Sequence, residues 1–170
     1  MPEDLILRDA TEGDLPAIVA IYNATIPSRM VTADLEPVTV EARRPWLAAH
    51  QHASRPIWVL CDVAGEEVWA WLSFDTFYPR AAYDGTAMVA IYVAADHQRH
   101  GLGRHLLQTA ITRAPAMGLH TLLGYIFGHN FPSLRLFEQL GFARWAHLPR
   151  IARLDADERD LVIVGRRVAP

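Results

Sequence analysis

The chain has 170 residues, of which 51% are hydrophobic, 21% charged and 9% aromatic, as is typical of a globular domain. Its only cysteine, Cys61, excludes a disulfide scaffold, and within the run Ile57–Cys61 we expect a buried thiol. All 16 basic residues are arginines, which excludes a Walker A phosphate loop and Schiff-base chemistry because both require a lysine.

The net charge of −3 at pH 7 is unevenly distributed along the chain. Residues 97–137 contain four arginines and no acidic residue, whereas the remainder is acidic. This predicts a local anion site and argues against a nucleic-acid partner, which would need a broad basic surface. The acidic start Met1–Asp4 leads into no long apolar run, so we expect no signal peptide, no membrane association and a cytoplasmic location.

The first half of the chain predicts a short strand, two helices and a hairpin. Thr11 and Asp14 have the spacing of a capping box, and the apolar residues that follow recur every three to four positions. Trp69 and Trp71 lie two residues apart in the second hairpin strand, so we expect them to share one face. The expected elements are the strand Leu5–Arg8, helices to about Asn23 and over Val40–His50, and the strands Ile57–Val63 and Glu67–Phe74.

The second half alternates strands and helices. A glycine-containing turn joins the expected strand Thr86–Val93 to an amphipathic helix, and a later helix begins near Pro132 and ends at Gly141. The mixed order predicts an α/β or α+β fold with one central sheet, and without a visible linker residues 1–170 are expected to form one domain. The other expected strands are Thr121–Phe127, Ala143–His147 and Asp160–Arg166.

The motif Gln98-x-x-Gly101-x-Gly103 lies between the strand that ends at Val93 and the helix that follows. Backbone N–H groups at a helix N-terminus are unpaired and carry the positive end of the helix dipole, so they can bind phosphate. The two glycines remove the Cβ atoms that would keep a pyrophosphate away. Arg99 and Arg104 can add positive charge, or either can be a solvated surface residue.

A dinucleotide-binding loop of the Rossmann type has to be considered, because Gly101-x-Gly103 begins its fingerprint. The third glycine of that fingerprint is replaced by Leu106, and residues 97–137 offer no acidic side chain for a ribose hydroxyl. A nicotinamide-dependent oxidoreductase therefore remains only a distant alternative.

The motif resembles the acetyl-CoA pyrophosphate loop of the GCN5-related N-acetyltransferases (GNAT). The resemblance implies a single domain with a central mixed, mostly antiparallel sheet flanked by helices. It implies acetyl-CoA as cosubstrate, a small amino-acid-like amine of the phosphinothricin, methionine sulfone or methionine sulfoximine type as acceptor, and a homodimer. Further segments occur in the order of the phosphinothricin acetyltransferase-like branch, namely Tyr22-Asn23, Glu36-Pro37, Ala82-Tyr83-Asp84, Ile91-Tyr92-Val93, Asn130-x-Pro132-Ser133 and Leu140-Gly141-Phe142.

The resemblance also implies which residues bind the cofactor. The backbone of the segment Ile91-Tyr92-Val93 would pair with the pantetheine arm, and the Val93 N–H would polarise the thioester carbonyl. Asn130 would reach the same arm, with Ser133 nearby, although Asn130 can equally be the N-cap of the helix it precedes. The pyrophosphate would lie against Arg99, His100, Gly101, Leu102, Gly103 and Arg104.

The acceptor side is expected on two segments. Arg80 could pair with a substrate carboxylate in bidentate fashion, or it could be a solvated loop residue. The implied acceptor-binding residues are Tyr78, Pro79, Arg80, Met88, Val89 and Ala90. No histidine or cysteine spacing matches a zinc pattern, so no metal is expected.

The sequence differs from the family at the positions of the general base and the general acid. Met88 replaces the strand glutamate that serves the branch as general base, and a thioether cannot accept that proton. Phe137 replaces a tyrosine or histidine that would reprotonate the leaving thiolate. These changes keep open an acyl-CoA-binding pseudoenzyme that lacks the general base. The groups that could replace the base are Asp84, Tyr83, Tyr22, Asp75 and a water chain to His129.

Overall fold

The computed structural model describes residues 5–51 and 54–169; the acidic start Met1–Asp4, on which the expectation of no signal peptide rests, lies outside them. The strands are β1 (Leu5–Asp9), β2 (Ile57–Asp62), β3 (Val68–Thr76), β4 (Thr86–Val93), β5 (Thr121–Phe127), β6 (Ala143–Leu154) and β7 (Asp157–Arg167). The α-helices are α1 (Leu15–Asn23), α2 (Val40–Ala49), α3 (Leu102–Arg113) and α4 (Phe131–Gln139).

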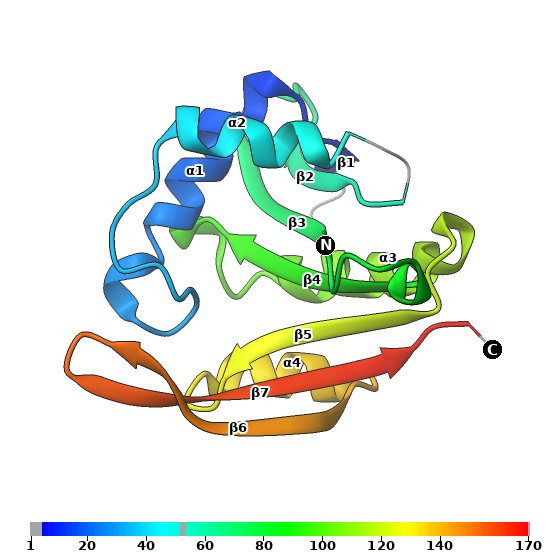
Figure 1. Ribbon diagram of the computed structural model, residues 1–170. Coiled ribbons are helices and arrows are strands. Elements are labelled where there is room, and N and C mark those ends of the chain that lie inside the picture. Colours follow the sequence, from blue (N-terminus) through cyan, green and yellow to red (C-terminus); the bar gives the residue numbers. More distant parts are fainter. Residues whose placement is uncertain (1–4, 52–53, 170) are drawn as a thin grey trace.

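The described residues form one seven-stranded sheet with the order β1-β2-β3-β4-β5-β7-β6 (Figure 1). Within it β4 and β5 pair in parallel and the other neighbours are antiparallel, which confirms the predicted mixed sheet. The last two strands are longer than expected and form a hairpin that extends past the rest of the sheet. No helix in the described parts of the chain is long and apolar enough to cross a membrane.

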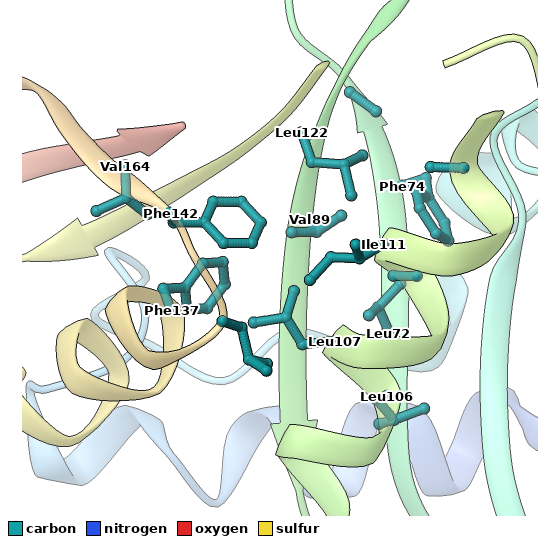
Figure 2. Packing of buried hydrophobic residues seen from close by; sticks show 14 of the residues in the cluster. Leu72, Phe74, Val89, Leu106, Leu107, Ile111, Leu122, Phe137, Phe142 and Val164 are labelled. Carbon is teal, nitrogen blue, oxygen red and sulfur yellow. The ribbon is translucent and has the colours of Figure 1, made fainter. Parts of the chain in front are cut away.

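Two hydrophobic layers pack on opposite faces of the sheet. The first lies under α1 and α2 and includes Ile18, Leu47 and Trp71. The second is larger and joins α3 and α4 to the sheet, because the apolar residues of both helices recur with helical spacing. Figure 2 shows this second layer, with the rings of Phe137 and Phe142 on one side of Val89 and Ile111 on the other.

A β-bulge separates the two tryptophans of β3. Leu60 pairs with Ala70 but Cys61 pairs with Val68, so the residue between them on β3 is extra. That residue, Trp69, packs against the α3 layer, whereas Trp71 is buried in the α1 and α2 layer. The prediction that the two side chains share a face is therefore wrong.

The sheet opens between β4 and β5. Their pairing runs from Thr86 opposite Thr121 to Met88 opposite Leu123, although the strands continue to Val93 and Phe127. Each strand stays paired on its outer side, β4 with β3 and β5 with β7. The two halves of the sheet consequently diverge toward the carboxyl ends of β4 and β5, as Figure 1 shows.

Candidate active site

A cavity of about 850 Å³ lies at this opening. One wall is the second half of β4 and the other is the end of β5, with the first turn of α4 beside them. The segment between α1 and α2 and the β6–β7 hairpin, through Ile151, Ala152 and Leu161, complete it. Of the residues predicted from the sequence to bind ligands, the cavity brings together Met88, Val89, Ala90, Ile91, Tyr92, Val93, Arg99, Gly103, Asn130 and Ser133.

The free edge of β4 offers backbone groups to the cavity. Ala94 N–H donates to the Trp69 carbonyl on the β3 side at 2.9 Å. Successive amides of a strand point to opposite sides, so the N–H groups of Ile91 and Val93 point toward β5. Pairing with β5 has ended at Met88 in the described residues, and this edge is therefore available to an extended, amide-containing ligand.

The loop after β4 leaves the backbone N–H groups at the N-terminus of α3 without a side-chain cap, so they can bind an anion. Gly101 precedes the first helical residue with φ +80°, a conformation that glycine adopts without strain, and it has no side chain to cap the helix. Arg99 also has a positive φ, of 64°, and lines the cavity. The first N–H groups of α3 and the Arg99 side chain thus form a positively polarised end to the cavity.

The remaining loop residues have different surroundings. Leu102 is buried in the α3 layer, so only its backbone can reach a ligand. His100 is exposed, and Arg104 donates to the Gln139 side chain of α4. Gly103 lines the cavity, and a Cβ added there would lie 3.5 Å from Leu136, which is ordinary van der Waals contact.

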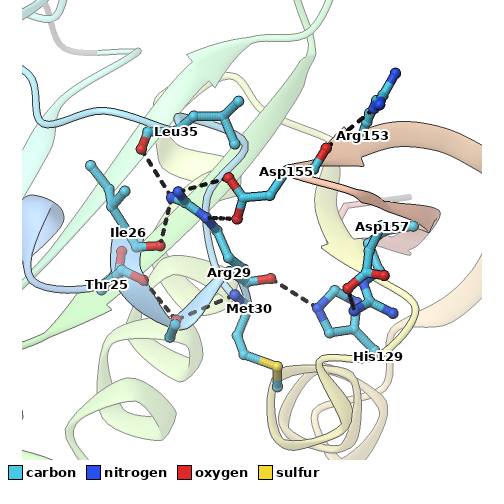
Figure 3. Close-up of polar contacts among 11 residues, drawn as sticks. Thr25, Ile26, Arg29, Met30, Leu35, His129, Arg153, Asp155 and Asp157 are labelled. Atoms are coloured by element: carbon cyan, nitrogen blue, oxygen red, sulfur yellow. Dashed lines mark hydrogen bonds and ion pairs between the residues drawn. The ribbon is translucent and has the colours of Figure 1, made fainter.

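A hydrogen bond and an ion pair hold the segment between α1 and α2 beside the cavity. The Asn130 side chain accepts from Ser133 N–H at 3.2 Å, which confirms the N-cap alternative, and its amide donates to the Met30 carbonyl at 3.0 Å. Arg29 forms an ion pair with Asp155 of the β6–β7 turn at 2.8 Å (Figure 3). A direct contact of Asn130 with the cofactor remains a prediction.

The α2 side of β4 is aromatic and charged. Tyr92 stacks on Trp71 of β3 at 4.4 Å between ring centroids and packs against Tyr22 of α1 at 5.1 Å. Met88 lies directly opposite Asp75 of β3, and both side chains line the cavity. A carboxylate is therefore present beside the position where the family has its glutamate, but it comes from the neighbouring strand.

Three donors hold the Asp75 carboxylate. Its Oδ1 accepts from Trp46 Nε1 and lies 3.1 Å from His50 Nε2, while its Oδ2 accepts from Ser73 Oγ at 2.5 Å. Burial favours the neutral acid, but the hydrogen bonds from His50, Ser73 and Trp46 outweigh it and hold the pKa of Asp75 below its ordinary value. Burial likewise opposes the charge of His50, yet its bonds to Asp75 and the Trp46 carbonyl raise the pKa of the imidazole.

The other side chains proposed to replace the general base do not line the cavity. The Tyr22 hydroxyl donates to Asp34 at 2.5 Å, and the His129 ring bonds to the Arg29 carbonyl. Tyr83 packs on Phe77 and Tyr78 in the exposed segment 77–84, which also holds Pro79, Arg80 and Asp84 and lies outside the cavity lining. Of the five groups, all within the described residues, Asp75 is the one that lines the cavity.

Phe137 is a core residue at the position where the family has a proton donor. It is 5% exposed and meets the Phe142 ring edge to face at 4.9 Å, and a Cβ at Gly124 would come within 2.7 Å of it. Its ring completes the cavity wall without a titratable group. The described residues contain no group of three side chains that could hold a metal ion.

Comparison with known proteins points to one family. A profile of the Acetyltransferase (GNAT) family matches residues 18–142. YwnH of Bacillus subtilis (strain 168), assigned as a phosphinothricin acetyltransferase, is 51% identical over 97% of this chain and 100% of its own length. The L-methionine sulfoximine/L-methionine sulfone acetyltransferase of Pseudomonas paraeruginosa (strain DSM 24068 / PA7) is 34% identical over 96% of this chain and 95% of that protein. The solved structure of yncA from Salmonella typhimurium with its cofactor acetyl-CoA has a TM-score of 0.89 and 27% identity, covering 98% of this chain and 95% of that one.

Proposed function

The chain belongs to the acetyltransferase (GNAT) family and is an N-acetyltransferase, and from this premise we propose that it acetylates the amine of a small amino-acid-like acceptor. One observation carries the proposal. The unpaired edge of β4 leads along the cavity to the N-terminus of α3, so a single ligand with an amide-containing arm and a pyrophosphate can contact both.

The residues around the cavity fit acetyl-CoA. We assign the pantetheine arm to the backbone of Ile91–Val93, with Asn130 and Ser133 beside it, and the pyrophosphate to the segment Arg99–Arg104. Acetyl-CoA, when bound, supplies the acetyl group as a thioester. The Val93 N–H, which points into the opening, would polarise the thioester carbonyl and stabilise negative charge that develops there.

The acceptor is proposed to be of the phosphinothricin, methionine sulfone or methionine sulfoximine type. Two relatives that align along nearly the whole chain carry these substrates in their names. The acceptor side of the cavity, which is lined by Met88, Ala90, Tyr92 and Asp75, suits an apolar side chain attached to an ammonium group. Pairing of Arg80 with the acceptor carboxylate remains a prediction.

The proposal extends to assembly and location. Large apolar side chains are exposed near the β6–β7 hairpin, among them Trp145 at 50% and Ile151 at 59%, and they favour a homodimer. Cys61 is a free buried thiol, which is compatible with a reducing cytoplasm. Residues 1–170 are taken as one N-acetyltransferase domain.

Binding and turnover test the proposal together. At a hundredfold excess over its dissociation constant, acetyl-CoA should stabilise the native state by about 2.7 kcal/mol, whereas NAD should not. A thiol-release assay with phosphinothricin, methionine sulfone and their relatives should give an N-acetyl product. Stabilisation by NAD alone would support an oxidoreductase, and binding of acetyl-CoA without turnover of any amine would support a pseudoenzyme.

A further inference from the structure

We propose that Asp75 binds the ammonium group of the acceptor and takes its proton, in the place of the family glutamate that Met88 replaces. The inference rests on the proposed function and adds a residue of β3 to its chemistry. Asp75 lies opposite Met88 in the β3–β4 register, and its side chain is 27% exposed where it lines the cavity. A carboxylate here therefore has access to the same space as one at position 88.

The position of the carboxylate is fixed by three donors, one from β3 and two from α2 and its C-terminal end. Ser73 is two residues earlier on the same face of β3, and Trp46 of α2 is one turn before His50, which directly follows that helix. Trp46 packs edge to face on Trp71 at 5.7 Å, and Ser73 is 1% exposed, so two of the donors are themselves immobilised. Such a preorganised carboxylate can hold an ammonium group at one place relative to β4.

The contacts of His50 also determine the charge of the pair. His50 Nδ1 lies 2.7 Å from the Trp46 carbonyl, which can only accept, so Nδ1 must carry a proton. His50 Nε2 lies 3.1 Å from Asp75 Oδ1, and this contact needs a second proton between the two atoms. This proton is assigned to the imidazole, because the pKa of His50 is raised and that of Asp75 is lowered, and Asp75 as a carboxylate keeps one lone pair of Oδ2 beyond the bond from Ser73.

The surrounding charges keep Asp75 ionised and accessible. The titratable and charged groups around Asp75 are His50 at the end of α2, Arg55 before β2 and Tyr92 of β4. Tyr22, Asp34 and Arg43 interact in turn with Tyr92. The Arg55 side chain donates to the carbonyls of Asp84 and Thr86, so its charge lies near the pair without occupying the carboxylate. An arriving ammonium ion completes the set of donors to Asp75.

The proposed step moves one proton. An N–H bond of the acceptor ammonium breaks, an O–H bond forms on Asp75, and the nitrogen lone pair becomes free to attack. Water takes the proton from Asp75 afterwards. As the C–N bond of the amide forms, the C–S bond of the thioester breaks, and the second nitrogen proton ends on the sulfur of the released thiol.

Asp75→Asn tests the assignment. We expect kcat/KM for the acceptor to fall by about 10²–10⁴-fold, the range of a lost general base, while the Kd of acetyl-CoA is unchanged. Wild-type kcat/KM should be independent of pH between the pKa of Asp75 and that of the acceptor amine. The variant should instead gain about tenfold per pH unit up to the amine pKa, because it depends on amine that is already neutral.

A spectroscopic readout is independent of turnover. The ¹⁵N signals of His50 should be those of an imidazolium near neutral pH in the wild type and of a neutral ring in Asp75→Asn, since the amide is a poorer partner for the charge. Asp84→Asn serves as the matched control: it removes an exposed carboxylate of the loop before β4, and kcat/KM should stay within about twofold.

The outcomes distinguish failure of the proposed function from failure of the role assigned to Asp75. A wild-type protein that acetylates no amine overturns the proposed function. A wild type that turns over, with Asp75→Asn retaining its kcat/KM and flat pH profile, overturns the role of Asp75 alone. If Asp75→Asn does not fold, Asp75→Glu keeps a carboxylate one methylene away, and a rising pH profile in that variant would equally contradict the assignment.

Discussion

The two faces of β4 differ in what they require of the sequence. Toward α3, Val89 belongs to a close-packed apolar layer, and Ile91 and Val93 pack against it. Toward α2, Met88 and Tyr92 lie beside a half-buried ion pair and a stack of aromatic rings. The first face holds the strand in place and leaves its backbone edge free for the proposed cofactor contacts, whereas the second lies beside Asp75 of β3, the proposed proton acceptor. Substitutions on the two faces should therefore separate stability from chemistry.

Phe137→Ala should have the largest effect on stability. The ring is buried between Gly124 and Phe142, so its loss leaves a cavity in the α3 and α4 layer. We expect the free energy of unfolding to fall by about 3–5 kcal/mol, measured by urea denaturation. Met88→Ala, on the other face and half-buried, should cost about 1 kcal/mol. Similar losses for both variants would argue against a division of roles between the faces.

Adding Met88→Glu to Asp75→Asn should rescue the chemistry of the α2 face. The two side chains lie opposite each other, so a carboxylate at 88 can reach the same ammonium group. We expect a gain in kcat/KM of roughly 10²-fold near pH 7 over Asp75→Asn, at the low end of general-base effects because the pocket is not adapted to it. A double variant that is no faster than Asp75→Asn would show that proximity across the strands is insufficient.

Gly101→Ala tests the backbone side of the site. At φ +80° an alanine is strained by about 1–2 kcal/mol, and relief of that strain would turn the amides of the α3 N-terminus. The Kd of acetyl-CoA should rise about tenfold, equivalent to 1.4 kcal/mol, in calorimetric titrations. Gly118→Ala is the matched control, since Gly118 has φ +78° and equal free space but follows α3 away from the cavity. Equal weakening by both variants would point to general destabilisation.

Arg80→Ala should have the smallest effect. Its side chain is exposed, and an exposed ionic contact with a ligand carboxylate contributes about 1 kcal/mol. We expect the KM of the acceptor to rise about fivefold with that of acetyl-CoA unchanged. If an amino acid and its decarboxylated amine are equally good acceptors, there is no carboxylate contact to assign.

The sequence predicts most of the fold because its local signals agree. Strand β4 has the expected bounds, and α1, α2, α3 and β5 lie where apolar periodicity and the glycine turn place them. The strand, glycine turn and helix N-terminus of the proposed cofactor side are local features too, and they lie where the sequence predicts them. Local sequence patterns could not predict that β4–β5 pairing ends at Met88, because this depends on how two strands far apart in the sequence diverge.

The side of the site that holds the proposed proton acceptor depends on the register of β3 against β4, so residue spacing along the sequence could not predict it. Asp75 and Met88 are 13 positions apart, and only the pairing of β3 with β4 places them opposite each other. The partners of Asp75 on α2, Trp46 and His50, were missed for the same reason. The alternation Ser73-x-Asp75 was the available signal, and it indicates a shared strand face but not what lies across it. The bulge at Trp69 shows that one extra residue places side chains two positions apart on opposite faces of the sheet.

A crystal structure of the protein with CoA and a methionine sulfone or phosphinothricin acceptor would test the division between the two faces of β4 most directly. We predict that the pyrophosphate lies at the N-terminus of α3 and that the acceptor nitrogen lies about 2.6–3.2 Å from a carboxylate oxygen of Asp75. An acceptor nitrogen bound away from Asp75, with its proton facing another group or a water chain, would contradict that division.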